Sequence, residues 1–165
     1  MKTSLRFVGI PALAVLLAGC SGEAARARQN RQEAKVRKLH ENALVWDCHN
    51  DLSYRVLYEG LNIGNRLPGG QVDIPRLREG SVDVQVVALF IQNYLYPGRA
   101  GRQCDQLLEA MLGAIAMNAS AVELARTGTD IERIVAAGKI AMPLAIEGGH
   151  AIEDDLELLR EFHAK

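Results

Sequence analysis

Apolar residues gather in three runs along the chain, and each run is followed by a stretch with helical periodicity. A short apolar run bounded by turn residues is typical of a strand that is buried on both faces. The three predicted strands cover residues 43–46, 82–91 and 140–146. The predicted helices that follow them cover residues 52–58, residues 105–126 and a segment that begins near residue 153. Strands that alternate with helices predict an α/β fold with a parallel sheet.

Turn and cap residues mark the borders of these elements. Residues 62–70 contain four Gly or Pro residues and form a predicted loop. Asp73 is expected to cap a short helix that ends before Gly80. Residues 129–132 have the pattern of a capping box at the start of another helix, which Gly138 ends. These signals divide the chain at the positions that alternating strands and helices require.

The chain stops soon after the last predicted helix begins. This helix would place Leu156, Leu159 and Phe162 on one face, and no strand follows before Lys165. A parallel layer that stops there leaves the edge of its last strand uncovered. We therefore expect residues 41–165 to be the truncated, N-terminal portion of a larger α/β domain.

The first nineteen residues have the pattern of an export signal. Lys2 and Arg6 precede an apolar stretch over residues 7–17, which matches a secretory signal peptide and is too short to span a bilayer. The Leu-Ala-Gly-Cys sequence that ends at Cys20 resembles the lipobox of bacterial lipoproteins. This resemblance implies cleavage before Cys20, acylation of its sulfur and a lipid anchor in the bacterial cell envelope, at the outer membrane or in the periplasm of a Gram-negative source. An ordinary signal peptide with an incidental cysteine is the alternative.

Residues 20–40 are expected to be a tether. They are rich in Ala, Arg, Gln, Glu and Lys, which are good helix formers, and they contain few apolar side chains to bury. The basic cluster from Arg26 to Lys38 fits two interpretations, a solvated helix face and a surface that touches anionic lipid headgroups.

Composition narrows the class of protein. Of the 165 residues 48% are hydrophobic, too many for a disordered chain. The formal net charge is −1, and without Lys2 and Arg6 it is −3, from 17 basic and 20 acidic residues. This balance argues against a nucleic-acid partner bound through bulk positive charge. Three cysteines are too few for a disulfide scaffold.

Candidate metal ligands follow the first and third predicted strands. His49 and Asp51 stand two residues apart, so in an extended chain their side chains leave on the same face. An imidazole nitrogen beside a carboxylate oxygen is half of a divalent-metal site, for which zinc is the favoured ion. Glu147 ends the third strand and precedes two glycines. Active sites of (β/α)₈ barrels lie at these strand ends, so we expect the three residues to converge there.

Neighbouring residues are candidates for supporting roles. Asp47 is expected to cap backbone amides of the loop, and Asn50 to fix the turn between the two ligands. His150 fits either a group that lies behind the metal ligands or a histidine that hydrogen-bonds the core. Tyr94 and Tyr96 fit either a substrate mouth or an ordinary surface loop.

Three segments together resemble the membrane (renal) dipeptidases, peptidase family M19. Residues 46–52, Trp-Asp-Cys-His-Asn-Asp-Leu, are similar to the D-x-H-N-D-L opening of that family. Residues 72–80 are similar to its D-I-P-R-L-R-x-G segment, and residues 146–150 match its E-G-G-H segment. The order and spacing of the three also agree, and the resemblance covers about residues 41–163.

The resemblance implies a zinc-dependent dipeptidase built on the N-terminal part, about three βα units, of a (β/α)₈ TIM barrel. His49 and Asp51 would bind one zinc, Glu147 would bridge two zinc ions, and a metal-bound water would attack the peptide bond of a dipeptide. The remaining metal ligands of the family would lie beyond residue 165. Three ligands cannot hold two zinc ions with usual coordination numbers, so this polypeptide is expected to be inactive alone. Ser53 stands where the family commonly has proline.

Two other classes remain open from the residues alone. One is a lipid-anchored, non-catalytic binding or envelope protein on a small complete α/β domain, in which the candidate ligands are structural. The other is a different barrel hydrolase with the same metal site, such as a phosphoesterase, although residues 72–80 argue against it because that segment has no metal role. The expected partners are a dipeptide substrate and the membrane, with a homodimer left open.

Overall fold

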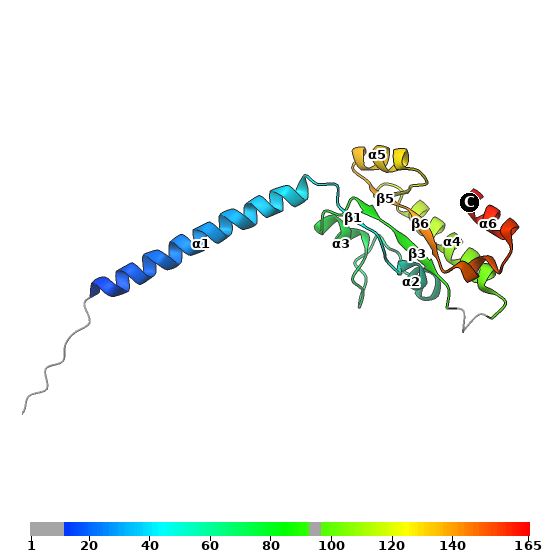
Figure 1. The fold of residues 1–165 in the computed structure, drawn as a ribbon, viewed down its shortest axis with the longest axis horizontal. Coiled ribbons are helices and arrows are strands. Elements are labelled where there is room, and N and C mark those ends of the chain that lie inside the picture. Colours follow the sequence, from blue (N-terminus) through cyan, green and yellow to red (C-terminus); the bar gives the residue numbers. More distant parts are fainter. Residues whose placement is uncertain (1–11, 93–96) are drawn as a thin grey trace, which may run out of the picture. The chain divides into compact units, whose positions relative to one another are not determined.

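The computed structural model describes residues 12–92 and 97–165, with side-chain surroundings from residue 22 onward (Figure 1). The chain divides into two units, Met1–Ala43 and Leu44–Lys165. The first nineteen residues, predicted as a signal peptide, lie partly outside the described range. The side chain of Cys20 lies outside it altogether, so its acylation stays a prediction.

Helix α1, Ala12–Glu41, makes up nearly all of the described part of the first unit. Every side chain from residue 22 to residue 41 is exposed, so this part of the predicted tether is a helix without a buried face. A sequence rich in Ala, Gln, Glu, Lys and Arg forms such a helix from propensity alone. Among the described helices, none is both long enough and apolar enough to cross a bilayer.

The second unit alternates short strands with helices. Its strands are β1 (Trp46–Asp47), β2 (Val84–Gln85), β3 (Val87–Phe90), β4 (Val122–Leu124), β5 (Ile140–Met142) and β6 (Leu144–Glu147). Its helices are α2 (Leu52–Glu59), α3 (Ile74–Glu79), α4 (Ala100–Met117), α5 (Gly128–Ala136), the 3₁₀ helix η1 (Gly149–Ile152) and α6 (Leu156–Ala164).

All strand pairs in the described part of the chain are parallel, as predicted. One sheet has the order β1-β2-β5-β4, and the other pairs β3 with β6. Two predicted strands are each split: residues 82–91 at Val86 and residues 140–146 at Pro143, which has no N–H to donate to a ladder. The Val87 N–H donates a hydrogen bond to the Pro143 carbonyl at 2.9 Å, and the pairing of β3 with β6 begins there. Their register places Phe90 opposite Glu147.

Several predicted element borders are wrong. The helix predicted over residues 105–126 ends at Met117, where the Asn118 side chain donates to the Ala114 carbonyl at 2.8 Å. Strand β4 follows within the predicted helix, because pairing with β5 outweighs local helix propensity. The first strand begins only at Trp46, and α6 begins at Leu156, after η1.

The capping box of α5 lies two residues before its predicted position. The Thr127 side chain accepts the Asp130 N–H at 3.1 Å, and the Asp130 carboxylate accepts the Thr127 N–H at 3.1 Å. Both Thr127 and Thr129 precede an acidic residue by three positions. The pattern therefore fits both threonines, and only the fold selects between them.

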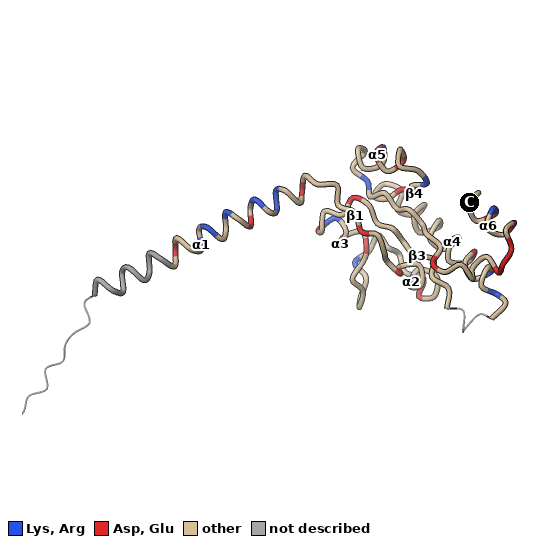
Figure 2. Tube along the Cα trace, viewed as in Figure 1, with Lys and Arg blue, Asp and Glu red and all other residues tan. Residues whose placement is uncertain are grey.

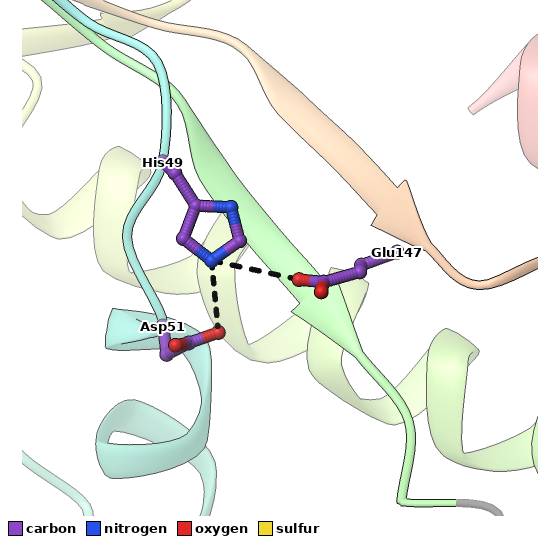
Figure 3. Close-up of side chains that lie close together, drawn as sticks. All are labelled: His49, Asp51 and Glu147. Carbon is purple, nitrogen blue, oxygen red and sulfur yellow. Dashed lines mark ion pairs between the residues drawn. The ribbon is translucent and has the colours of Figure 1, made fainter.

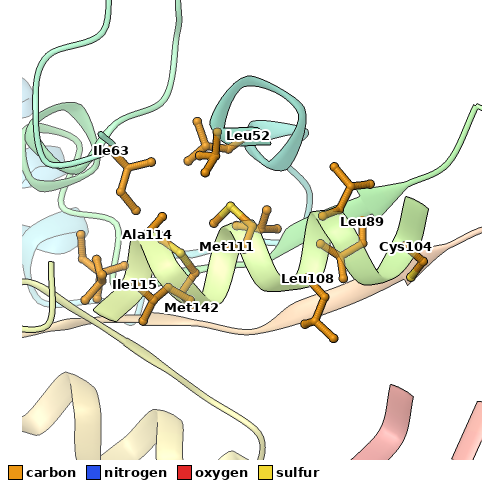
Figure 4. Packing of buried hydrophobic residues seen from close by; sticks show 14 of the residues in the cluster. Leu52, Ile63, Leu89, Cys104, Leu108, Met111, Ala114, Ile115 and Met142 are labelled. Carbon is orange, nitrogen blue, oxygen red and sulfur yellow. The ribbon is translucent and has the colours of Figure 1, made fainter. Parts of the chain in front are cut away.

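The main core lies between α2, α4 and strands β3 and β5 (Figure 4). Helix α4 contributes buried residues with helical spacing, Cys104, Leu107, Leu108, Met111, Ala114 and Ile115. A smaller cluster joins α5 to Val84 of β2 and Ala141 of β5. The core thus packs against β3, which pairs with β6, the strand that ends at Glu147.

Asp73 is a buried carboxylate that ties the predicted loop to helix α3. One oxygen accepts the Arg76 N–H at 2.8 Å, as the expected N-cap. The other accepts the Leu67 N–H at 2.9 Å and is paired with the Arg76 guanidinium. Burial raises the pKa of Asp73, but these hydrogen bonds and the Arg76 charge outweigh burial and hold the pKa below its usual value.

Asp73→Asn should therefore destabilise the protein in a pH-dependent way. An amide nitrogen in place of one oxygen faces the Leu67 N–H without accepting it, so we expect a loss of about 2 kcal/mol at pH 7. A lowered folded-state pKa stabilises above the ordinary carboxyl pKa of about 4 and loses that stability as pH falls through the folded-state value. Urea unfolding at pH 7 and pH 3 checks this, and a difference that does not shrink in acid would contradict it.

Candidate metal centre

Three side chains from two distant parts of the chain converge beside the ends of β1, β3 and β6 (Figure 3). The His49 Nε2 atom lies 3.7 Å from an Asp51 carboxylate oxygen and 3.5 Å from a Glu147 carboxylate oxygen. One ligand atom from each residue lies within 4.8 Å of the other two. The convergence expected from the sequence is thus present in the fold.

The loop after β1 is shaped by its own polar side chains. The Asp47 carboxylate accepts the His49 N–H at 3.1 Å, and the Asn50 side-chain oxygen accepts the Leu52 N–H at 2.7 Å. These are the backbone contacts expected of Asp47 and Asn50. They fix the chain immediately before His49 and after Asp51, so both side chains project to the same side.

Ala88 of β3 anchors this loop from both sides of Asp51. Its N–H donates to the Asn50 carbonyl at 2.8 Å, and its carbonyl accepts the buried Ser53 hydroxyl at 2.7 Å. A proline at position 53 would have no hydroxyl for the second contact. Nothing in the sequence indicates this role, because the partner of the hydroxyl is a backbone carbonyl 35 residues along the chain.

Ser53→Ala should loosen Asp51 as well as weaken the fold. Removing the hydroxyl takes a hydrogen-bond partner from the Ala88 carbonyl, which we expect to cost about 1 kcal/mol of folding free energy. Zinc affinity should fall roughly tenfold, as for other groups that orient ligands indirectly. Zinc titration and urea unfolding measure the two effects, with Ser120→Ala on the exposed surface as control. Lower stability at unchanged zinc affinity would show that Ser53 is only structural.

Glu147 is held at the end of β6 by a turn that needs glycine. Gly148 has φ of +96°, and a Cβ atom there would overlap the imidazole ring of His150. One Glu147 carboxylate oxygen, the one 3.5 Å from His49 Nε2, is buried and forms no hydrogen bond with the residues that the structure describes. An acceptor without a donor in this position is suited to a cation.

His150 lies behind the turn and contacts the neighbouring strand end. Its Nε2 atom is 2.8 Å from the Ile91 carbonyl oxygen, just after β3. Of the two roles expected for His150, this contact matches a hydrogen bond to the core. The imidazole ring also lies against Gly148. His150 therefore supports the turn that carries Glu147. Tyr94 and Tyr96 lie outside the described residues.

The donor set fits a divalent transition metal. One neutral imidazole nitrogen and two carboxylate oxygens are the ligand types that zinc accepts. The three side chains, His49, Asp51 and Glu147, are 56%, 62% and 44% exposed, so the cluster is open to solvent on one side. An open side is what a catalytic metal needs for water and substrate, whereas structural zinc sites are closed.

Comparison with known proteins assigns the family. The family model for the membrane dipeptidases, peptidase family M19, matches residues 33–165, and the chain belongs to this family. It is 30% identical over 149 residues to Dipeptidase ataJ of Aspergillus terreus, an alignment that covers 82% of this chain and 36% of that protein.

Solved structures show the same fold. The chain is similar to the probable dipeptidase PvdM from Pseudomonas aeruginosa, with a TM-score of 0.68 and 22% identity over 83% of this chain and 36% of that one. It is also similar to a metallo peptidase from Rhodobacter sphaeroides liganded with a phosphinate mimic of the dipeptide L-Ala-D-Ala, with a TM-score of 0.61, 20% identity and coverage of 73% and 42%. The fold is thus the N-terminal part of a TIM-barrel-like α/β domain, and the chain spans less than half the length of these relatives.

Proposed function

We propose that this chain carries the first metal-binding half of a zinc-dependent membrane dipeptidase that hydrolyses short dipeptides. The observation that carries the proposal is the convergence of His49, Asp51 and Glu147 at the ends of parallel strands. Family membership supports the same reaction. Family membership and the convergence of the three residues both disfavour a non-catalytic envelope protein, since such a protein does not require these side chains to lie together.

Each of the three residues would have a distinct part in the site. His49, neutral, would offer its Nε2 lone pair, and Asp51 would offer an oxygen on the same side of the loop. Glu147 has two oxygens, which suits it to bridge a second ion. Bound zinc would lower the pKa of a water molecule and polarise the scissile carbonyl. The solved structure of the similar metallo peptidase, liganded with a mimic of the dipeptide L-Ala-D-Ala, supports a dipeptide as the substrate class.

We also propose that the chain is inactive by itself and is anchored to a membrane. Residues 20–165 by themselves should not turn over a dipeptide, because the described residues bring together three ligands, fewer than two zinc ions require. Acylation of Cys20 would anchor the chain to the bacterial envelope. The proposed anchor draws on the sequence pattern of residues 1–20.

Zinc titration of the full chain tests the proposal. Wild type should bind about one zinc ion per chain, since three ligands and one water complete a tetrahedral site. The double variant His49→Ala/Asp51→Ala should lose this binding, while His163→Ala, an exposed histidine on α6, should keep it. Equal binding by wild type and the double variant would overturn the site. Zinc-dependent hydrolysis of an Ala-Ala dipeptide by residues 20–165 would overturn the expected inactivity and leave the site standing.

A further inference from the structure

Helix α1 carries several Lys and Arg residues along its described length (blue in Figure 2), and neither the fold nor the candidate metal centre uses them. Arg28, Arg31, Lys35 and Lys38, here called the basic stripe, follow one another at intervals of three, four and three residues. At 3.6 residues per turn they fall within an arc of about 80°. All four are exposed, and none forms an ion pair within the part of the chain that the structure describes.

The acidic residues of the same helix lie on a different side from the basic stripe. Glu23, Glu33 and Glu41 fall in a second arc whose centre lies about 140° away. Arg26 and Arg37 lie on that acidic side. The helix is therefore charged differently on its two sides, although its sequence mixes the two signs. A uniformly solvated helix would not need this separation.

The two units of the chain also differ in charge. Residues 22–41 contain six basic and three acidic side chains, a net charge of +3. Residues 44–165 contain eleven basic and seventeen acidic side chains, a net charge of −6. An anionic surface would thus attract the helix and repel the rest of the chain.

We propose that the basic stripe binds the anionic surface of a phospholipid bilayer, with the axis of α1 lying along the membrane. Lys and Arg side chains are attracted to anionic headgroups, and each one adds to the binding only within about a Debye length of the surface. The exposed Leu39 lies beside the stripe and supplies an apolar contact at the same interface. This inference goes beyond the proposed dipeptidase activity and does not depend on it.

Distances along α1 favour an orientation in which the helix axis is parallel to the membrane surface. At 1.5 Å per residue, Lys38 is about 27 Å from Cys20 along the axis. If Cys20 is acylated, a helix perpendicular to the bilayer would hold Lys38 far beyond the Debye length of about 8 Å. A helix parallel to the bilayer brings all four stripe residues to the headgroups. The lipid anchor proposed above would thus strengthen this binding without being required for it.

Vesicle binding by the full chain tests whether the basic stripe binds an anionic bilayer. The chain carries Cys20→Ser, so that acylation contributes nothing, and co-sedimentation is measured at 0.1 M NaCl. One set of vesicles contains phosphatidylcholine alone, and the other contains phosphatidylglycerol in addition. Arg31→Gln/Lys35→Gln removes two charges from the stripe. Arg26→Gln/Arg37→Gln removes two charges from the acidic side and is the matched control. Lys2 and Arg6 are present in every variant, so their contribution cancels.

The expected result depends on which face loses charge. Phosphatidylglycerol should strengthen binding of the Cys20→Ser chain to vesicles. The affinity of the stripe variant for the vesicles with phosphatidylglycerol should be lower by at least about tenfold. The control should lose less than threefold, with the same helix content by circular dichroism. Equal losses in the two variants would show attraction by net charge without a docking face and would overturn the proposal. Binding that does not depend on phosphatidylglycerol would overturn it as well.

Discussion

Glu147→Gln is expected to weaken zinc binding at least about a hundredfold while leaving the metal-free fold intact. The substitution keeps the size of the side chain and removes its negative charge. It also replaces one of two metal-binding oxygens by an NH₂ group, which cannot donate a lone pair to a metal. Groups that merely orient ligands contribute ten- to hundredfold in affinity, so a direct ligand should contribute no less.

The loss of zinc affinity in Glu147→Gln can also be measured as a smaller stabilisation of the folded state by zinc. At a zinc concentration of about 100 times the wild-type Kd, binding stabilises the folded state by about 2.7 kcal/mol. A hundredfold weaker Kd leaves about 0.4 kcal/mol at the same concentration. Unfolding curves with and without zinc should therefore differ clearly for wild type and hardly at all for Glu147→Gln.

The metal-free variant provides the internal check. Glu147 is half-exposed, and its buried oxygen accepts no hydrogen bond from the described residues. Without zinc, the free energy of unfolding of the variant should therefore lie within about 0.5 kcal/mol of the wild-type value. Glu157→Gln on α6 makes the same charge change at a highly exposed position away from the cluster and should respond to zinc as wild type does. A zinc response of wild-type size in Glu147→Gln would exclude this carboxylate as a ligand.

Met111→Ala is expected to destabilise the fold by about 3 kcal/mol, within the 2–5 kcal/mol found for Met-to-Ala changes in protein cores. Met111 is fully buried on α4, in the core that also contains Leu52 of α2 and Leu89 of β3 (Figure 4). Truncation removes the apolar side chain and leaves a cavity that the surrounding elements fill only partly.

Met117→Ala is the matched control, on the same helix and with the same change of residue. Met117 is 68% exposed at the last position of α4, so its truncation should change the unfolding free energy by less than about 0.5 kcal/mol. Urea unfolding of both variants measures the difference, provided the slope with denaturant is unchanged. Similar small effects at the two positions would mean that α4 is not packed as described.

Local patterns were enough to predict that His49, Asp51 and Glu147 meet, because their convergence follows from the positions of strand ends. His49 and Asp51 lie two residues apart, and Glu147 ends a buried apolar run. Parallel strands bring their carboxyl ends to one edge, so three local signals predict a convergence across about a hundred residues of chain. The helix cap at Asp73 was predicted for the same reason, since a cap depends on neighbours within three residues.

Features that depend on partners far along the chain could not be predicted. Strand β4 lies where the sequence favours helix, and only pairing with β5 makes it a strand. The Ser53 hydroxyl has a partner in Ala88, and the His150 ring has one in Ile91, both of them backbone carbonyls that any residue would offer. A backbone partner leaves no trace in residue identity, so the sequence cannot show it.

The sequence by itself determined the alternation of strands and helices, the three candidate metal ligands and the family they indicate, because each rests on short-range spacing. Only the tertiary structure decided how far each strand extends, which threonine caps α5 and how the loop carrying Asp51 is fastened to β3. Those choices are made by long-range hydrogen bonds and burial, whose energies exceed local propensities of a few tenths of a kcal/mol per residue.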